Sequence, residues 1–226
     1  MRILAIDTSL GQVSACLFDL DAQFVLATKS QIVERGHAEI LVPLIADLLL
    51  DGNSSFDRID RVAVTTGPGS FTGLRIGIAA ARSIAEVHGL PLVGVSTLSA
   101  LAAPLVVSKQ FSNIASVIDA RNDRVYLQIV DASGAILVEP SLVTFEQASR
   151  MCMMSDLAVI GNVSSRLSKM VWNNGGRVSA FHDVIAPSVS DVAMLGALAA
   201  GGDSHVIPLY LATSQYKKNA ALLLAQ

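Results

Sequence analysis

The sequence predicts an α/β protein made of two similar halves, each of a βββαβα type. Two observations support this prediction. Apolar segments of strand length alternate with longer segments of helix length along most of the chain, which is typical of a sheet with helices on both faces. In addition, the pattern of residues 5–26 returns in residues 117–138, about half the chain further on.

The two copies of this repeat share a pattern more than identities. Each reads as a short apolar strand that ends in aspartate, a polar turn, a second strand that ends in aspartate, and a third strand. Asp7 corresponds to Asp119, and Asp19 corresponds to Asp131. A chance similarity between two β-meanders is the alternative. A true repeat would set the architecture of the whole chain.

Helices and strands are expected to alternate after each group of three strands. In the first half we expect helices over 37–50, 73–88 and 96–107 and strands over 62–66 and 92–95. In the second half we expect helices over 145–154, 164–172 and 190–200 and a strand over 157–160. We place the boundary at residue 108, so that the halves comprise residues 1–108 and 109–226.

The composition is that of a globular chain with a large core, with 52% hydrophobic and 15% charged residues. The net charge of -3 disfavours a protein that binds nucleic acid by itself through a broad basic surface. Cys16 and Cys152 match no metal or disulfide framework and fit a reducing compartment. The chain reaches Asp7 too early for a signal peptide, and the apolar run 40–50 is interrupted by Pro43 and too short to span a bilayer. We therefore expect a cytoplasmic protein with no membrane contact.

The glycine-rich stretch GPGSFTGLRIG, residues 67–77, lies between an expected strand and an expected helix, where phosphate often binds. Ser70 or Thr72 can cap this helix. The stretch lacks the lysine of a P-loop, and Thr72 occupies the last glycine position of a dinucleotide fingerprint. Pro68 removes one amide donor. A tight structural turn is therefore the alternative to an anion site.

A candidate nucleotide site combines this turn with the aspartate that ends the first strand. Its residues are Asp7, Thr8, Ser9, Gly69 and Ser70. The alternative is that the carboxylate of Asp7 only binds the amides of its own turn, as strand-end aspartates often do.

The helix after the turn carries small residues four positions apart, namely Gly73, Gly77, Ala81 and Ala85. Glycine inside a helix costs about 1 kcal/mol relative to alanine, so Gly77 is expected to have a packing reason. Small residues at this spacing let another backbone approach closely. The approaching element is either the protein's own sheet or a helix of another chain.

The expected helix over 37–50 is apolar almost all round. Its non-apolar positions Glu39, Pro43 and Asp47 form one narrow stripe, which Arg35 and Asp51 extend. Because a surface helix needs only one apolar stripe, such a helix should be covered on two sides, which favours a protein–protein interface. The predicted interface residues are His37, Leu41, Leu44, Leu48, Gly73, Leu74, Gly77, Ile78 and Ala81.

No catalytic residue or metal site is predicted. The four histidines occur at no i, i+3 or i, i+4 spacing, so no helical zinc pair is present; they are His37, His88, His182 and His205. No GxSxG elbow for a serine hydrolase occurs either.

The layout of three strands followed by alternating helices and strands, duplicated, resembles the actin-like ATPase (ribonuclease H-like) superfamily. In that superfamily a nucleotide lies between the halves, with its phosphates near the first hairpin of each half. The corresponding hairpins here are DTSLG (7–11) and DARND (119–123). The superfamily pattern DxG[TS] is matched only in part, because Asp7-Thr8-Ser9 lacks the glycine, with Ser9 at its position.

Several segments resemble the TsaB (YeaZ) family, in its order and over nearly the whole chain. They are RILAIDTS (2–9), GHAEILVP (36–43), GPGSFTGLRIG (67–77), GVSTLSALA (94–102), VIDAR (117–121) and PLYLA (208–212). The resemblance implies a duplicated actin-like fold and a role in making threonylcarbamoyladenosine in tRNAs that read codons beginning with A. One departure lies at the C-terminus, where Ala212, Lys217 and Lys218 replace a run that often has arginine.

The resemblance also implies partners. The catalytic subunit is a TsaD-like threonylcarbamoyltransferase with an HxxxH metal motif, which this chain lacks. The chain would be its non-catalytic activating scaffold, joined by a TsaE-like ATPase. It would form a homodimer when alone and meet tRNA only through the complex. It would need no cofactor itself, since ATP and a divalent metal belong to the complex. Family dimers pack through N-terminal helices, which correspond here to residues 37–50 and to the helix from Gly73.

Two alternative functions remain open. An ATPase or kinase of the actin-like superfamily would need an adenosine loop in the second half, for which Gly161, Gly175, Gly176 and residues 197–204 are candidates. A glycoprotease is disfavoured because neither HxxxH nor HExxH occurs.

Overall fold

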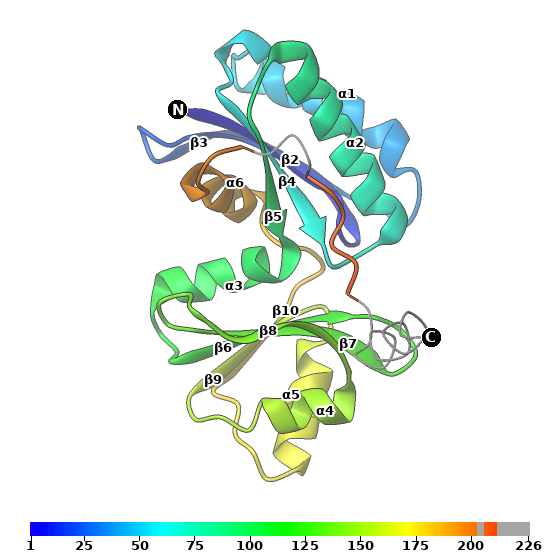
Figure 1. Ribbon diagram of the computed structural model, residues 1–226, viewed down its shortest axis with the longest axis vertical. Coiled ribbons are helices and arrows are strands. Elements are labelled where there is room, and N and C mark those ends of the chain that lie inside the picture. Colours follow the sequence, from blue (N-terminus) through cyan, green and yellow to red (C-terminus); the bar gives the residue numbers. More distant parts are fainter. Residues whose placement is uncertain (203–205, 212–226) are drawn as a thin grey trace, which may run out of the picture. The chain divides into compact units, whose positions relative to one another are not determined.

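The computed structural model describes residues 1–202 and 206–211 and contains two compact units (Figure 1). The first unit comprises Met1–Ala100 together with Ile185–Leu209, and the second contains Leu101–Val184. Each unit is built around one five-stranded sheet, as the repeat predicts.

The sheet of the first unit has the order β3-β2-β1-β4-β5. Its strands are β1 (Arg2–Asp7), β2 (Gln12–Asp19), β3 (Phe24–Ile32), β4 (Arg61–Gly67) and β5 (Leu92–Ser96). The first three strands are antiparallel neighbours, whereas β4 and β5 run parallel to β1. The helical elements are α1 (His37–Asp51), η1 (Phe56–Arg58), α2 (Phe71–His88) and α6 (Val189–Leu198).

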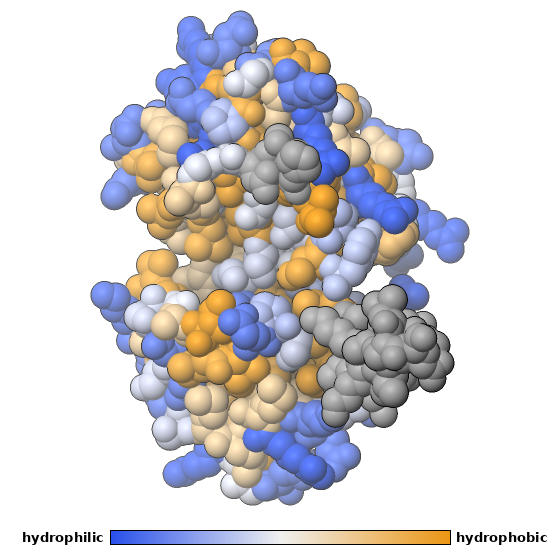
Figure 2. Space-filling model, in the orientation of Figure 1, coloured by the Kyte–Doolittle hydropathy of each residue, from blue (hydrophilic) through white to orange (hydrophobic). Residues whose placement is uncertain are grey.

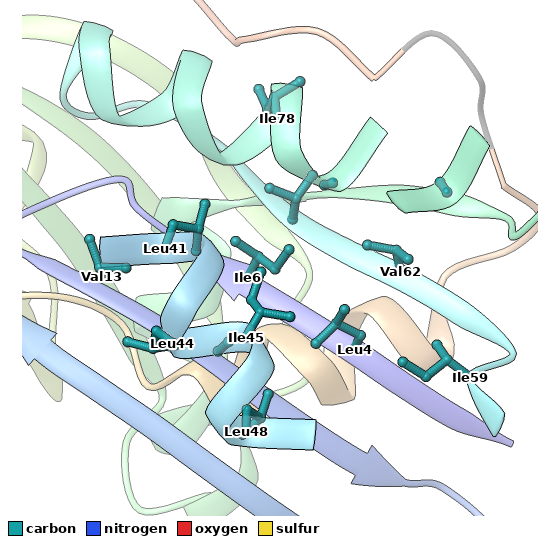
Figure 3. Close-up of a cluster of buried hydrophobic side chains, with 14 of the residues drawn as sticks. Leu4, Ile6, Val13, Leu41, Leu44, Ile45, Leu48, Ile59, Val62 and Ile78 are labelled. Atoms are coloured by element: carbon teal, nitrogen blue, oxygen red, sulfur yellow. The ribbon is translucent and has the colours of Figure 1, made fainter. Parts of the chain in front are cut away.

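Helices cover both faces of this sheet, because the side chains of β1 alternate between them. Leu4 and Ile6 belong to the cluster under α1 and α2, and Ile3 and Ala5 belong to the cluster under α6. Figure 3 shows the first cluster, in which apolar side chains of α1 face those of β1 and β2. The α1 residues of this cluster are Leu41, Leu44, Ile45, Leu48 and Leu49, at the three- and four-residue spacing of one helix face.

The ends of α2 follow from local sequence. Ser70 precedes the helix with extended backbone, and its side chain accepts a hydrogen bond from the amide of Gly73 at 3.2 Å. This is the N-cap predicted for Ser70. Gly89 ends the helix in the left-handed conformation, with φ 63°.

The second unit repeats the same order of elements with the sheet order β10-β9-β6-β7-β8. Its strands are β6 (Asn113–Asp119), β7 (Arg124–Asp131), β8 (Ile136–Thr144), β9 (Leu157–Gly161) and β10 (Ala180–Asp183). Its helices are α4 (Phe145–Met151) and α5 (Ser164–Asn173), and α3 (Thr97–Ser108) leads into it from the first unit. The short strand β10 was not predicted, and α4 ends three residues earlier than expected.

The internal repeat is confirmed. Asp7 and Asp119 are the last residues of β1 and β6, and Asp19 and Asp131 are the last residues of β2 and β7. In each half three antiparallel strands come first, and the two later strands are parallel to the first of them or to each other. The chance-similarity alternative is therefore excluded.

The compact units differ from the predicted halves at α6, which falls within the predicted second half (109–226) but packs on the sheet of the first unit. Two contacts explain this placement. A Cβ on Gly196 would lie only 2.4 Å from the Cβ of Ala63, so the glycine lets the helix approach β4 closely. Arg61 Nη1 donates to the carbonyl oxygens of Gly196 at 2.9 Å and Ala199 at 2.8 Å, at the C-terminal end of α6, where a cation is favoured.

Among the described residues, no helix is long and apolar enough to cross a membrane. Figure 2 shows hydrophilic and hydrophobic side chains interspersed over the visible face of both units.

Replacing Arg61 by alanine should therefore loosen α6 from the first unit. We expect Arg61→Ala to lower the free energy of unfolding by about 1–3 kcal/mol, because the terminal carbonyls of α6 lose their donor. Arg58→Ala, at an exposed arginine nearby, should change it by less than about 0.5 kcal/mol. Urea denaturation measures both variants, and equal losses would contradict this role of Arg61.

Candidate functional site

The turn after β1 is held by the carboxylate of Asp7. Asp7 Oδ1 accepts hydrogen bonds from the amide of Ser9 at 3.0 Å and from Thr65 Oγ1, on β4, at 2.7 Å. Asp7 and Ser9 have no exposed surface. Burial raises the pKa of Asp7, while the hydrogen bonds from Ser9 and Thr65 act in the opposite direction. The carboxylate thus fixes the turn to the neighbouring strand.

The start of α2 packs directly on this turn. Thr8 Oγ1 donates to the carbonyl oxygen of Gly73 at 2.7 Å, and the amide of Ser70 donates to the carbonyl oxygen of Ser9 at 2.7 Å. A Cβ on Gly73 would lie 2.1 Å from the carbonyl oxygen of Thr8, and one on Gly77 would lie 2.3 Å from Thr8 Oγ1. The small residues of α2 therefore let the helix approach the chain's own first strand, so of the two predicted alternatives the structure shows the internal one.

The five residues of the predicted nucleotide site do come together here. A Cβ on Gly69 would lie 2.2 Å from the carbonyl oxygen of Ser9, so Gly69 is also in close backbone contact with the turn. The side chain of Ser70 caps α2, and Asp7 Oδ1 and Thr8 Oγ1 bind other groups of the first unit. Asp7 Oδ2 and Ser9 Oγ are buried and have no hydrogen-bond partner among the described residues. Nucleotide binding at these residues stays a prediction.

The structure corrects the choice of partner-interface residues. Most of the predicted residues face the core of the first unit and cannot present their side chains to another chain: Leu41, Leu44, Leu48, Gly73, Leu74, Gly77, Ile78 and Ala81 are buried. His37 is partly buried, and its Nε2 has no hydrogen-bond partner among the described residues. The physical reason is that the sheet itself takes up the more regular apolar stripe of each helix.

A second apolar stripe on each of the two helices faces outward, and together they line an open groove of about 730 Å³. On α1, Val42 is 66% exposed and Leu50 is 78% exposed, so this side of the helix presents apolar surface to solvent. The groove is lined by Val42, Ile45, Ala46, Leu49, Leu50, Ser54, Ser55, Phe56, Ala80, Ser83 and Ile84. No charged side chain is among these residues. The groove lies on the two helices for which the sequence predicts an interface, but on the sides opposite to most of the predicted residues.

Comparison with known proteins identifies the family. The family model described as "TsaD: tRNA N6-adenosine threonylcarbamoyltransferase" matches residues 27–208. The "tRNA threonylcarbamoyladenosine biosynthesis protein TsaB" of Bacillus subtilis is 29% identical over 223 residues, covering 93% of this chain and 94% of that protein. The chain belongs to the TsaB (YeaZ) family.

Other members agree with this assignment. Escherichia coli TsaB is 36% identical over 129 residues, covering 56% of this chain and 53% of the relative, so this match spans about half of that relative's length. The structure of YeaZ from Pseudomonas aeruginosa is 25% identical, with a TM-score of 0.79, and the match covers 93% of this chain and 99% of that one. The fold is thus the duplicated actin-like fold that the repeat predicts.

The second half of this TsaB family member does not reproduce the turn after β1. Asp119, the counterpart of Asp7, is exposed; its Oδ1 accepts from the amide of Arg121 at 2.9 Å, and its own amide donates to Asn162 Oδ1 at 2.9 Å. The first of these bonds is the local turn contact that was the alternative to a phosphate site. The two aspartates of the repeat therefore share a position but differ in environment.

Two of the glycines proposed for an adenosine loop, Gly161 and Gly176, lie in close contacts that leave no room for a Cβ. A Cβ on Gly161 would lie 1.7 Å from the carbonyl oxygen of Val117, and one on Gly176 would lie 2.6 Å from the side chain of Val171. Gly175 has φ 82°, in the turn after α5. Residues 203–204 of the other candidate segment lie outside the described residues, as do His205, Ala212, Lys217 and Lys218.

Metal-binding side chains do not gather in this TsaB family member as far as it is described. Residues 1–202 and 206–211 contain no group of three or more His, Cys, Asp or Glu side chains placed to hold a metal ion. The thiols of Cys16 and Cys152 are buried, and burial raises the pKa of each to about 12. Neither cysteine is therefore a reactive thiolate at neutral pH.

The contact between Gly77 and Thr8 can be tested by adding a side chain. Gly77→Leu should lower the free energy of unfolding by about 3 kcal/mol or more, because the new Cβ would overlap Thr8 Oγ1. Ala79→Leu, on the exposed side of the same helix, should change it by less than about 0.5 kcal/mol. Thermal and urea unfolding of the two variants would show this difference, and a fully stable Gly77→Leu would contradict the packing described.

The environment of Asp7 predicts a dependence of stability on pH. Because burial raises its pKa above the ordinary value of 3.8, the protonated carboxyl is favoured in the folded state. The stability of the native protein relative to Asp7→Asn should therefore be highest below pH 3.8 and fall as the pH rises through the folded pKa.

Asp131→Asn provides a control for which the effect of pH on stability has the opposite sign. Hydrogen bonds from Ser133 lower the pKa of Asp131, so the folded state favours its charged form. The contribution of Asp131 to the stability of the protein should therefore be lost as the pH falls. Urea titrations between pH 3 and pH 7 measure how the free energy of unfolding of the native protein and of each variant changes with pH. If the stability of the native protein relative to Asp7→Asn rises with pH, the description of Asp7 is refuted.

Proposed function

We propose that this chain is a non-catalytic subunit in the synthesis of threonylcarbamoyladenosine on tRNAs that read codons beginning with A. In this role it binds and activates a TsaD-type threonylcarbamoyltransferase. The proposal is supported by its membership of the TsaB family, whose curated members from Escherichia coli and Bacillus subtilis are named for threonylcarbamoyladenosine biosynthesis. The observation that carries it is the apolar groove between α1 and α2.

The groove has the chemistry of a surface that a helical partner would cover. Val42 and Leu50 leave most of their apolar area in water, and burial of such area contributes about 25 cal/mol per Å². Ala46, Ala80 and Ser83 are small, so a partner's backbone can approach the bottom of the groove. An exposed apolar surface rimmed by polar residues marks an interaction site in many proteins.

The sequence supports a role without catalysis in this subunit. It has no HxxxH pair, and in the turn after β1 Asp7 Oδ1 and Thr8 Oγ1 form hydrogen bonds within the first unit. In this proposal ATP and a divalent metal are bound by other subunits. A magnesium-dependent ATPase activity of the pure protein that Asp7→Asn abolishes would instead favour the ATPase alternative.

The remaining partners follow from the same proposal. A second copy of the chain would occupy the groove between α1 and α2 when no transferase is present. A TsaE-like ATPase would join the assembled pair, and tRNA would be contacted only through the complex. The homodimer and the heterodimer then compete for one surface, so adding transferase should convert one into the other.

A charge placed in the groove should weaken this association. We expect Val42→Asp to lower the affinity for a TsaD-type transferase by about tenfold or more, because the carboxylate would be buried among apolar side chains. The matched control is Val107→Asp, at a valine on α3 that is 63% exposed and outside the groove. Calorimetric titration of each variant with the transferase measures the effect. Equal affinities of the native protein and Val42→Asp would refute the proposed surface.

A further inference from the structure

The edge strand β3 presents an open edge for strand pairing. It is nine residues long and the outermost strand of its sheet, and among the described residues no strand pairs with its other edge (Figure 1). The amide of Val33 donates to the carbonyl oxygen of Gly11, so these two residues form a hydrogen-bonded pair of the antiparallel ladder between β3 and β2. Counting back from Val33, every second residue of β3 is then in a pair without hydrogen bonds to β2. Because bonded and non-bonded pairs alternate, Thr28, Ser30 and Ile32 direct their backbone groups away from β2. All three residues are exposed.

The polar stripe of α1 lies beside this edge and is separate from the stripe that lines the α1–α2 groove. A second, smaller groove of about 330 Å³ runs between α1 and β3. Its lining residues are Lys29, Ser30, Gln31, Glu39, Ile40, Pro43, Leu44 and Asp47. The sequence singled out Glu39, Pro43 and Asp47 as the non-apolar positions of this helix, and neither the core nor the proposed transferase site uses them.

The charge of the smaller groove is negative. Lys29 forms an ion pair with Asp51 at 2.5 Å, so the only lysine among the lining residues already has a carboxylate partner. Glu39 and Asp47 form no ion pair with any residue that the structure describes. A strand added to β3 would therefore place the side chains on one of its faces near two unpaired carboxylates.

We propose that the open edge of β3 binds an extended segment of another protein that carries basic residues on one face. Main-chain hydrogen bonds to Thr28, Ser30 and Ile32 would add it as a sixth strand, as in other cases of strand addition. Glu39 and Asp47 are eight residues apart on a helix, which corresponds to about 12 Å. Basic side chains four residues apart on a strand are separated by about 13 Å, so each can meet one carboxylate.

The same charges disfavour a second copy of this chain as the occupant. Antiparallel pairing of two β3 strands around a two-fold axis would place both α1 helices on the same face of the joined sheet. Glu39 and Asp47 of each copy would then lie toward those of the other, and like charges facing one another oppose pairing. Edge strands commonly use charge in this way to avoid self-association. The occupant is therefore a different, basic chain.

A synthetic nine-residue peptide of alternating lysine and threonine tests the proposal. Fluorescence anisotropy would measure its binding to the full chain, beside a glutamate–threonine peptide and a lysine–threonine peptide with alternate amides N-methylated. We expect only the unmodified lysine peptide to bind, because N-methylation keeps the charge and removes the strand donors. No binding of that peptide, or equal binding of the N-methylated one, would overturn the proposal.

Paired variants of the protein locate the site. Glu39→Gln with Asp47→Asn should weaken peptide binding by roughly 3- to 10-fold, the effect of losing two exposed ion pairs. Asp57→Asn with Glu86→Gln removes the same charge from exposed positions of the first unit outside the smaller groove and should leave the affinity unchanged. Equal weakening by both pairs would mean attraction to net charge alone and would overturn the proposal.

Sedimentation tests whether a second copy of this chain, and not a basic segment of another protein, occupies the edge of β3. If the lysine peptide dissociates a dimer of this chain, the edge of β3 belongs to a second copy, and the proposal is overturned. The result we expect is binding of the peptide with no change in oligomeric state. Binding of the peptide is independent of the proposed transferase site, because Val42 does not line the smaller groove. Val42→Asp should therefore leave peptide binding unchanged.

Discussion

The contact between the turn after β1 and the backbone of α2 is the constraint on which the first unit depends. Thr8 donates its hydroxyl hydrogen to the carbonyl oxygen of Gly73 and lies against Gly77, while Asp7 ties the same turn to Thr65 of β4. Only glycine at positions 69, 73 and 77 allows the backbones to approach this closely. This contact fixes which face of α2 is turned toward the sheet, and therefore which face remains for a partner.

The outward surface of the first unit follows from that orientation. With Ile78 and Ala81 held against the sheet, Ala80, Ser83 and Ile84 of α2 must line the groove beside α1. On α1, the side chains of Leu41 and Leu48 face the same core, which leaves Val42, Ala46 and Leu50 at the surface. A motif that looks like a phosphate loop in sequence thus has a mechanical role. It positions α2, one of the two helices that we propose to meet the transferase.

Those parts of the fold that depend on local or repeated sequence patterns could be predicted from the sequence. The strand-end aspartates Asp7, Asp19, Asp119 and Asp131 predicted the duplicated triplets, and Ser70, the N-cap of α2, was one of the two capping residues expected. Features that depend on packing between segments far apart in the sequence could not be predicted. A helix as apolar as α1 does not indicate which of its stripes meets the sheet. The close approach of α2 to Thr8, and that of α6 to Ala63, depend on residues far apart in sequence. For the same reason, most of the residues predicted for a partner interface are buried in the core of the first unit.

In the proposed function, the outer face of α1 and α2 is the surface that a TsaD-type transferase covers. Hydrogen–deuterium exchange of the chain, alone and mixed with such a transferase, tests this most directly, since slowed exchange marks amides that become protected. We predict slower exchange in residues 38–56 and 76–88 on mixing, with no change in β6, β7 and β8. Protection confined to the second unit, with α1 and α2 unaffected, would contradict the account.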